Sequence, residues 1–490
     1  MSIFTLVKSC DLRLCSMGKP LEEEADFREP LLRPEPAGPI RDPENGSVAH
    51  LPAAPSQPVF DSHGQPIEDQ CSITSSVFNL ANTTIGAGIM ALPRAFATLG
   101  IMLGTVMLVI TYALSYFSLA TIVRASEQFK EQTYADLVRS QFGRAGSLLL
   151  QLSIIINNAG IMIIYLIILG DVLVGVGPTY NGLITNALHI HSGDVWYVSR
   201  PFVLAVACFC VLGPLIALKS LRGLSKVSVA SMVLALTFCG SMFGLAILAY
   251  FKGQVSDIYI LPNPDMLGRD IKHILPAALG VMPVLMTAYI CHFNLIPVMH
   301  SMYCPTKSRI LKVVRRSLTV CTVAYLLIAI GGYIVFGSST DGDVLRNITP
   351  ENLTPLIGRT PAEVFCTAVR LAYCICLSAA FALVNWALRE TLASLILREE
   401  HLAGVGFYAL TCATLGVLYA TAVVVPSIWF AMSLMGATAS VTLGFIFPGL
   451  LATKLDSQSG LRMLLAYTMV ATGVVTGVAG VLKTVVWDQH

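Results

Sequence analysis

The sequence predicts an all-α polytopic membrane protein that crosses the bilayer about eleven times. Of the 490 residues, 55% are hydrophobic and only 12% are charged, whereas soluble domains average roughly 25% charged residues. The apolar residues form runs of the length that a helix needs to cross a bilayer, about 20 residues. These runs make the lipid bilayer the expected partner. The net charge of +2 creates no strong field, so nucleic acid is not expected as a partner.

The candidate membrane spans follow from where polar and charged residues interrupt the apolar pattern. They lie at about 73–97, 101–123, 147–175, 201–218, 227–251, 273–300, 313–336, 363–388, 403–424, 428–451 and 462–485. Two joints between them are very short. Leu99-Gly100 separates the first two spans, and Val425-Pro426 separates the ninth from the tenth, so the number of spans depends most on these joints.

The distribution of Lys and Arg predicts the orientation of the chain. Basic residues gather in alternate loops, at 124–144, 219–226, 307–316, 389–398 and 454–462. Because loops rich in Lys and Arg stay in the cytosol, we expect a cytosolic N-terminus and a C-terminus on the other face. The glycosylation patterns at Asn347 and Asn352 then fall on the non-cytosolic face, where glycans are added.

Residues 1–70 are rich in Pro, Glu and small polar residues, a composition that does not bury a core. We expect them to form a disordered cytosolic tail. Within the tail, FREPLL is close to the acidic dileucine signal for sorting to lysosomes and vacuoles, with Phe27 where that signal has an acidic residue. Leu31 and Leu32 therefore either bind a sorting adaptor or are a chance pair of leucines.

Two of the candidate spans contain helix-breaking residues at membrane depth. The first span holds Gly86, Gly88 and Pro93, and the span at 273–300 holds four such residues: Pro276, Gly280, Pro283 and Pro297. Glycine and proline destabilise a helix interior by about 1 and about 3 kcal/mol, and lipid cannot satisfy the backbone groups that a break frees. Because the breaks occupy corresponding places in two halves of five spans, they predict an inverted repeat with the substrate bound between them.

The free backbone groups at the two breaks indicate the chemistry of the substrate. N-termini of half-helices carry free N–H groups and partial positive charge, which suit a carboxylate. C-termini of half-helices present carbonyl oxygens, which suit an ammonium group or a sodium ion. A zwitterionic amino acid matches both ends. The alternative is that the small residues of GAGIM (86–90) serve close helix packing; the second break favours the substrate site.

Four stretches resemble the amino acid/auxin permease family: NLANTTIGAGIMALP (79–93), INNAGIMIIYLIILGDVLVG (156–175), AYICHFNLIPV (288–298) and GATASVTLGFIFPGL (436–450). They are most similar to plant vacuolar amino-acid transporters, which are related to the sodium-coupled neutral amino-acid transporters of animals. The resemblance implies the LeuT-type fold of five plus five inverted helices, with an eleventh helix outside the repeat. It also implies amino acids as substrates and alternating access.

This fold divides the chain at approximate boundaries. The cytosolic tail occupies 1–70, helices one to six occupy 71–300, helices seven to ten occupy 301–455, and the eleventh helix with the C-terminus occupies 456–490.

The resemblance also implies roles for individual residues. The loop that binds the substrate carboxylate corresponds to five residues: Ile85, Gly86, Ala87, Gly88 and Ile89. The unwound part of the sixth helix, which shapes the side-chain pocket, corresponds to Ala288, Tyr289 and Cys291.

The resemblance ties sodium coupling to Asn82 in the first span and to a hydroxyl group in the eighth helix. Asn82 aligns with an asparagine that serves sodium in the animal transporters, which also use a hydroxyl group in the eighth helix. The nearest hydroxyl here is on Ser378, and Ala380 occupies the other candidate position. A sodium ion needs several oxygen ligands.

Ionisable residues inside membrane spans are candidates for carrying protons. Asp171 lies near the non-cytosolic end of the third span, and His292 lies deep in the broken sixth span; an ordinary histidine pKa near 6.5 suits an acidic compartment. Each also has a structural interpretation, Asp171 as a hydrogen-bond acceptor and His292 as a buried neutral ring. Arg370 follows Glu363 by seven residues, so both lie on one helix face, and we expect Arg370 either to pair with Glu363 or to snorkel towards the interface rather than to contact substrate.

These observations predict a secondary active transporter that carries neutral amino acids by symport from a vacuole or lysosome to the cytosol. Protons are the expected coupling ion and sodium the alternative, with no metal site and no cofactor. Two other functions remain open: an amino-acid sensor on a transporter fold, and sodium-coupled uptake at the plasma membrane. We expect no enzyme, because the sequence shows no HExxH pattern, paired mid-membrane aspartates or recognisable serine–histidine spacing.

Overall fold

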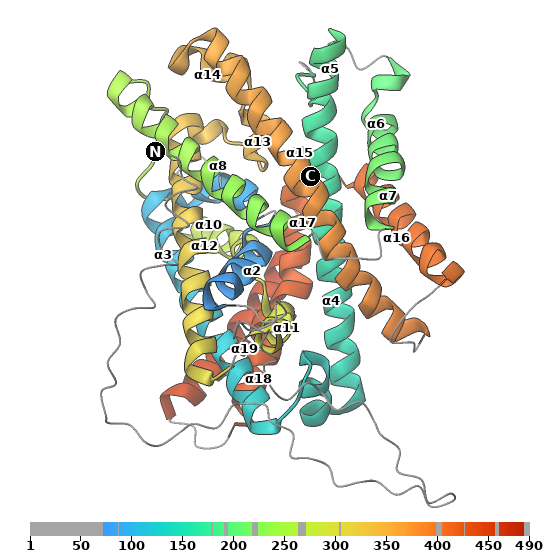
Figure 1. The fold of residues 1–490 in the computed structure, drawn as a ribbon. Helices are drawn as coiled ribbons and strands as arrows, with labels where there is room; N and C mark the ends of the chain where they lie inside the picture. Colours follow the sequence, from blue (N-terminus) through green and yellow to red (C-terminus); the bar gives the residue numbers. More distant parts are fainter. Residues whose placement is uncertain are drawn as a thin grey trace, which may run out of the picture.

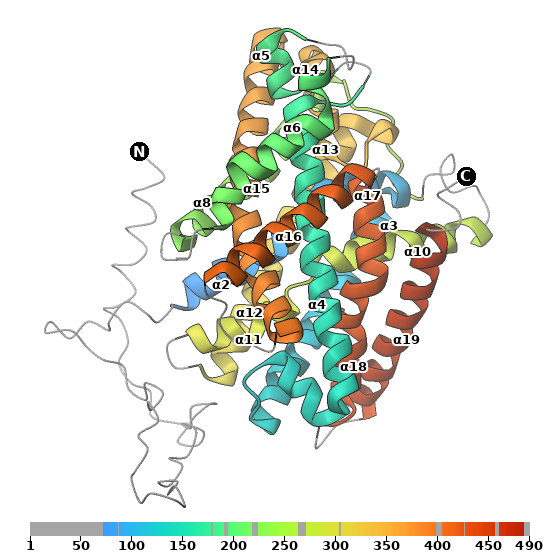
Figure 2. The ribbon, with the colours of Figure 1, turned by 90° about the vertical axis from the view of Figure 1, so that its right-hand side faces the viewer.

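The structure is a computed structural model that describes residues 72–86, 88–177, 180–190, 195–217, 224–262, 271–302, 305–397, 404–425, 427–455 and 460–484. The regular elements in these ranges are all helices, and nine of them are long and apolar enough to cross a membrane. Figures 1 and 2 show them as one bundle, with α8 and α19 on opposite sides in Figure 2. The predicted tail with Leu31 and Leu32, and Ala87 of the first break, lie outside the described residues.

The first predicted span is divided into two helices. α2 (Ile73–Ile85) begins at Ser72, whose hydroxyl accepts a hydrogen bond from the Ser75 amide at 3.2 Å. α3 (Gly88–Phe129) follows the break and contains one non-helical residue, Gly100, with φ 75° and ψ 167°. A side chain at Gly100 would be strained at this φ and would place its Cβ 2.2 Å from the Leu261 carbonyl oxygen, so the short joint predicted there requires glycine.

The remaining long helices follow in chain order. They are α4 (Tyr134–Val174), α8 (Leu224–Lys252), α12 (Lys307–Phe336), α15 (Arg359–Leu392), α16 (Gly404–Val424) and α19 (Gly460–Leu482). α10 (Ile271–Ala288) and the shorter α11 (His292–Ser301) together form one candidate span. Between α16 and α19, α17 (Ile428–Met435) and α18 (Phe447–Ala452) are joined by π-helical turns and together form another. Shorter helices are α5 (Leu183–Leu188), α6 (Arg200–Val206), α7 (Gly213–Ile216), α13 (Val344–Asn347) and α14 (Pro350–Ile357).

The nine long helices differ from the eleven predicted spans for two reasons. α3 contains the second half of the first span as well as the whole second span, with the kink at Gly100 between them. The fourth predicted span, 201–218, corresponds to the shorter apolar helix Arg200–Ile216.

Packing places the two broken regions in the middle of the bundle. α2 contacts α12, α8 and α11, while α10 contacts α3, α17 and α19. α4 runs along the other side of the site against α15, α16 and α17, and Figure 1 shows α2 and α11 inside this frame.

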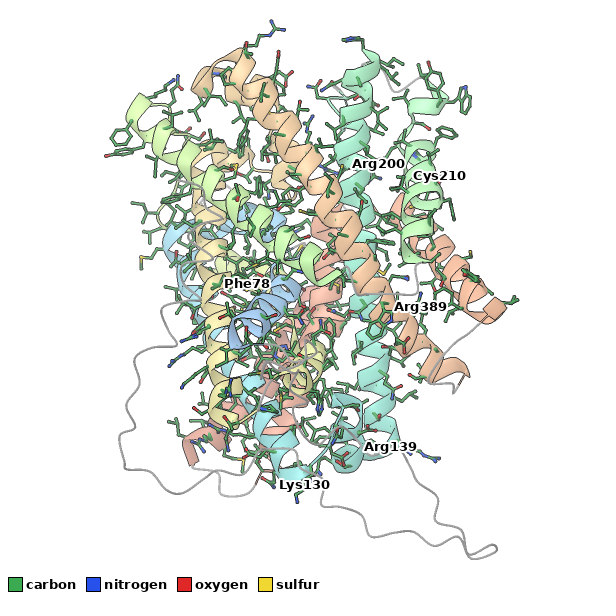
Figure 3. The ribbon with its side chains drawn as sticks, viewed as in Figure 1. Phe78, Lys130, Arg139, Arg200, Cys210 and Arg389 are labelled. Atoms are coloured by element: carbon green, nitrogen blue, oxygen red, sulfur yellow. The ribbon has the colours of Figure 1, made fainter. Side chains whose placement is uncertain are left out.

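Charged residues assigned to opposite faces of the membrane lie at opposite ends of the bundle. Figure 3 shows Lys130 and Arg139, which the orientation places in the cytosol, at the end far from Arg200. This is the arrangement that the predicted orientation requires.

Candidate functional site

The two broken helices meet at their breaks. α2 ends at Ile85 and α3 begins at Gly88, while α10 ends at Ala288 and α11 begins at His292. A Cβ added to Gly88 would lie 2.9 Å from the Ala288 Cα. The two breaks are therefore in direct contact, and Gly88 permits this contact because it has no side chain.

Tyr325 of α12 fastens the ends of the two half-helices together. Its buried hydroxyl donates to the Thr84 carbonyl at 2.8 Å and also to the Ala288 carbonyl. Both carbonyls belong to the last turn of a helix, where carbonyls lack intrahelical partners and carry partial negative charge. Beside it, the Tyr289 hydroxyl pairs with that of Thr322 at 2.7 Å, so α12 holds two adjacent residues where α10 ends and the second break begins.

A cavity of about 400 Å³ adjoins the breaks, and we call it the inner cavity. It extends from Gly86 and Gly88 along α2 to Ser75 and along α11 to Ser301, towards the end predicted to face the cytosol. Its polar groups include the linked Asn294 and Thr83 side chains (3.1 Å) together with Asn158 and Thr287. None of the described residues that line it is Asp, Glu, Lys, Arg or His.

A second cavity of about 290 Å³, the lateral cavity, lies on the side of the first break that faces α8 and α15. It shares Asn82, Gly86, Tyr165 and Ala380 with the inner cavity. The Tyr165 hydroxyl oxygen would lie 3.2 Å from a Cβ on Gly86, so this phenol stands directly over the break. Tyr165 lies in one of the stretches that carry the family resemblance, yet its place over the break was not apparent from the sequence.

The predicted substrate residues divide into two groups. In the first break, Ile85, Gly86 and Ile89 line the lateral cavity and Gly86 and Gly88 line the inner cavity. In the second break, Ala288, Tyr289 and Cys291 are buried and line neither cavity, whereas their neighbours Thr287 and Ile290 line the inner cavity.

The contacts with α12 explain this difference in the second break. They hold residues 288 and 289 against α12, and this leaves 287 and 290 to form the cavity wall. The predicted stretch is therefore at the site, but its cavity-facing residues are different ones.

The residues predicted to couple an ion are not all at the break. Asn82 lines both cavities, and so does Ala380, which has no hydroxyl group. Ser378 lines neither cavity and donates its hydroxyl to the Cys374 carbonyl at 2.7 Å.

His292 is buried and also lines neither cavity. Its two ring nitrogens have no hydrogen-bond partner in the described part of the chain. Its ring packs beside Gly444 of the π-helical region, whose added Cβ would lie 3.4 Å from the His292 Cε1.

Asp171 belongs to a separate group of charges, the outer charge cluster (Asp171, Arg200, Asp343, Arg346 and Arg370). Its carboxylate accepts hydrogen bonds from Arg200 Nε at 2.9 Å and from Arg346 Nη2 at 2.8 Å. The cluster lies near the Arg200 end of the bundle, away from Lys130 and Arg139 (Figure 3). Asp171 is therefore the acceptor for two arginines that connect α4 to α6 and α13.

Arg370 belongs to this cluster and does not pair with Glu363. It donates to the backbone carbonyls of Ile348, at 3.1 Å, and Asn181, while Glu363 pairs with Arg359 at 3.0 Å. The seven-residue spacing placed both residues on one face, but nearer acceptors come from Ile348 in the loop at 338–359 and from Asn181 in the segment between α4 and α5.

Asp343 is a buried carboxyl group that sequence reasoning missed. It lies between α12 and α13 in the non-membrane loop, with 1% of its surface exposed. Its Oδ1 accepts a hydrogen bond from the Leu345 amide at 2.9 Å, and its Oδ2 has no partner among the described residues. Burial, followed by the nearby Asp171 charge, raises the pKa of Asp343 to about 7. Nothing in the sequence around a loop aspartate signals this burial.

The chain was compared with known proteins. A family model described as "Transmembrane amino acid transporter protein" matches residues 69–486. Amino acid transporter AVT6A of Arabidopsis thaliana is 32% identical over 88% of this chain and 95% of its own length. Vacuolar amino acid transporter 6 of Saccharomyces cerevisiae is 24% identical, with 78% and 90% covered. Putative sodium-coupled neutral amino acid transporter 11 of Danio rerio is 25% identical, with 88% and 90% covered.

Among solved structures, a manganese transporter of Eremococcus coleocola superposes with a TM-score of 0.57 at 11% identity, covering 84% of this chain and 86% of that one. At this identity the likeness concerns the fold alone. The predicted all-helical membrane fold and the predicted family are both confirmed. The match over residues 69–486 and the plant relative at 32% identity show that the chain belongs to the transmembrane amino acid transporter protein family.

Proposed function

We propose that this amino acid transporter is a secondary active carrier of neutral amino acids, which it exports from a vacuole or lysosome to the cytosol by alternating access in symport with protons. The observation that carries the proposal is the contact between two broken helices at the head of a cavity without ionised side chains. A zwitterion supplies the opposite charges that free helix ends attract.

The break supplies a partner for each end of the zwitterion. The first amides of α3, beginning at Gly88, have no intrahelical acceptor and adjoin the inner cavity, so they suit the substrate carboxylate. The ends of α2 and α10 present carbonyls for the ammonium group. Tyr325 already donates to Thr84 and Ala288, so the ammonium group uses the other carbonyls of these last turns.

The lining of the cavities supports a neutral substrate side chain. Neither cavity has a described Asp, Glu, Lys, Arg or His on its wall. A charged substrate side chain would lose its hydration there without gaining an ionic partner, which is unfavourable.

The fold supports alternating access between two halves. The likeness to the manganese transporter and the paired breaks in α2–α3 and α10–α11 support a LeuT-type arrangement of five plus five helices. Eleven spans result when α3 is divided at Gly100 and the shorter helix Arg200–Ile216 is counted. The inner cavity extends towards the predicted cytosolic end, while the outer charge cluster closes the opposite end. This arrangement fits a conformation that releases substrate to the cytosol.

Protons are preferred to sodium because the eighth-helix hydroxyl group expected of a sodium site is missing from the cavity wall. Ala380 stands on the wall beside Asn82 where a hydroxyl would be needed, and Ser378 is turned towards Cys374. Hard cations need several oxygen ligands. The yeast relative is named a vacuolar transporter, in line with our proposal. The zebrafish relative is named a putative sodium-coupled transporter, in line with the alternative of sodium-coupled uptake at the plasma membrane.

The test is uptake of a radiolabelled amino-acid panel into proteoliposomes under one gradient at a time. Proton symport predicts accumulation of neutral amino acids driven by a pH gradient in sodium-free buffer. Accumulation that follows sodium at constant pH and is lost in Asn82→Ala would favour the sodium-coupled alternative. Saturable binding without flux would instead identify a sensor built on the same fold.

A further inference from the structure

The lateral cavity is a second space at the proposed substrate site, and the carboxylate and ammonium groups bound at the break do not fill it. It begins at Gly86 and Ile89 and continues between α8 and α15. Because it shares Gly86, Asn82 and Tyr165 with the inner cavity, the two spaces adjoin on either side of the first break. A molecule whose main-chain atoms bind at the break therefore has two directions in which its side chain can extend.

The two directions differ in character. The inner cavity follows α2 and α11 towards one end of the bundle as far as Ser75 and Ser301, as an exit route would. The lateral cavity instead continues sideways between α8 and α15, where Leu234, Thr237 and Ala368 on its wall are exposed. A space that adjoins the main-chain site without extending along the exit route is suited to hold a substrate side chain while the main-chain atoms are bound.

The wall of the lateral cavity is suited to a large apolar or aromatic side chain. Phe238 and Tyr373 pack edge to face on it, with ring centroids 5.0 Å apart, and Phe365, Val369 and Leu377 continue the surface. Edge-to-face contacts add to the stabilisation from apolar burial. The volume of about 290 Å³ equals roughly ten water molecules at about 30 Å³ each, which is enough for a phenyl or indole group.

We infer that the lateral cavity receives the side chain of the transported amino acid, and that the preferred substrates are neutral amino acids with large apolar or aromatic side chains. The inference rests on the proposed transport function and adds the substrate class. The competing occupant is a lipid acyl chain, because Leu234 on the α8 wall is 37% exposed. The bare backbone of Gly86 at the inner end favours an amino acid over an acyl chain, because a zwitterion supplies hydrogen-bonding groups there and hydrocarbon does not.

The experiment fills the cavity and measures which substrates are lost. Ala372 is a small residue on the α15 wall, so Ala372→Trp occupies the space without changing the break. The matched control is Ile375→Trp on the same helix, at a position that is 60% exposed and lines neither cavity. Both variants and the wild type are reconstituted, and kcat/KM is measured for glycine, alanine, leucine, phenylalanine and tryptophan.

We expect the wild type to favour leucine, phenylalanine and tryptophan over glycine and alanine. Ala372→Trp should lower kcat/KM for the three large substrates by at least about tenfold relative to alanine, a typical effect of a pocket that loses room for a side chain. Ile375→Trp should keep the wild-type order. A converse variant, Phe238→Ala, enlarges the cavity and should raise the preference for tryptophan over leucine, which a poorly folded protein would not do.

Several results would overturn the inference. An equal reduction for all five amino acids in Ala372→Trp, with no change of order in Phe238→Ala, would indicate that lipid or helix packing fills the space. An unchanged profile in both variants would show that the side chain lies in the inner cavity. If the wild type carried none of the amino acids, the proposed function itself would fail, and the inference with it.

Discussion

Tyr325 has one hydroxyl hydrogen and two carbonyl acceptors on different half-helices, Thr84 on α2 and Ala288 on α10. A single O–H group donates fully to only one of them at a time. The residue therefore connects the two breaks while leaving part of the acceptor capacity for another donor. Such a connection is easily broken when one half of the transporter moves against the other.

Tyr325→Phe should destabilise this conformation and slow transport. It leaves two buried carbonyls without their donor, and one unsatisfied buried group costs about 1–3 kcal/mol. We expect a lower melting temperature in detergent and a reduced maximal uptake rate. The control is Tyr467→Phe on α19, where the side chain is 60% exposed and little should change. Equal melting temperatures for the two variants would contradict the connecting role.

Asp343 should make this conformation more stable in acid. Its pKa is raised from 3.8 to about 7 by burial and by Asp171, so the folded cluster binds a proton more tightly than the opened one. The stabilisation is fully present below pH 4 and is lost as the pH rises to about 7. The charged groups that act on it are those of α4, α13, α15 and the same loop: Asp171, Arg346, Arg370 and Asp341.

We expect the melting temperature of the wild type to be higher at pH 5 than at pH 7.5. The contribution of Asp343 is the part of this pH response that the Asp343→Asn variant lacks. Asp343→Asn should reduce this difference, because an amide does not titrate. Asp257→Asn, at an exposed side chain in the loop after α8, should keep it. A pH response that is the same in both variants would show that Asp343 does not bind the proton.

At the scale of helices, the sequence indicated that the sixth span is broken, but its prolines do not mark the position of the break. Pro276 and Pro283 lie inside α10, which remains helical until Ala288. A proline removes one hydrogen bond, and the surrounding helices can compensate for it. The break at 289–291 is instead set by contacts with Thr322 and Tyr325 on α12, which no local pattern reveals.

The first break was more predictable because backbone properties determine it. Gly86 and Gly88 were recognised as residues that permit close approach, and both lie on the cavity walls. At the second break, the residues on the cavity wall are Thr287 and Ile290, beside the predicted Ala288, Tyr289 and Cys291, because the wall depends on how the turn faces its neighbours. Asp343 and Tyr325 were not identified because burial and long-range hydrogen bonds created their roles.

At the scale of the whole molecule, the inner cavity and the outer charge cluster lie on opposite sides of the breaks. The predicted orientation places the cluster on the luminal face, where Arg200 lies opposite Lys130 and Arg139 (Figure 3). The glycosylation patterns of the same loop provide a test of this orientation. Both side-chain amides donate to backbone carbonyls, that of Asn347 to Ser339 at 3.1 Å and that of Asn352 to Asn347 at 2.9 Å. They differ in exposure, because Asn347 is 9% exposed whereas Asn352 is exposed.

We therefore expect a glycan on Asn352 and none on Asn347 when the protein is made in a eukaryotic host. Asn352→Gln should abolish the enzymatically removable mobility shift on a gel, and Asn347→Gln should leave it. Glycans are added only on the luminal side. If an acceptor site introduced at 124–144 were glycosylated and Asn352 were not, the predicted orientation would be wrong.

The central claim is that an amino acid binds where the two breaks meet, and Gly88 tests it most directly. A leucine there would place its Cβ 2.9 Å from the Ala288 Cα and would fill the space beside the α3 amides. The measurement is uptake of a neutral amino acid into proteoliposomes by Gly88→Leu, with Gly240→Leu as control, because a Cβ at Gly240 meets no atom within 4 Å. We predict loss of uptake in Gly88→Leu alone, with both variants monodisperse in detergent; uptake by Gly88→Leu at the wild-type rate would contradict the claim.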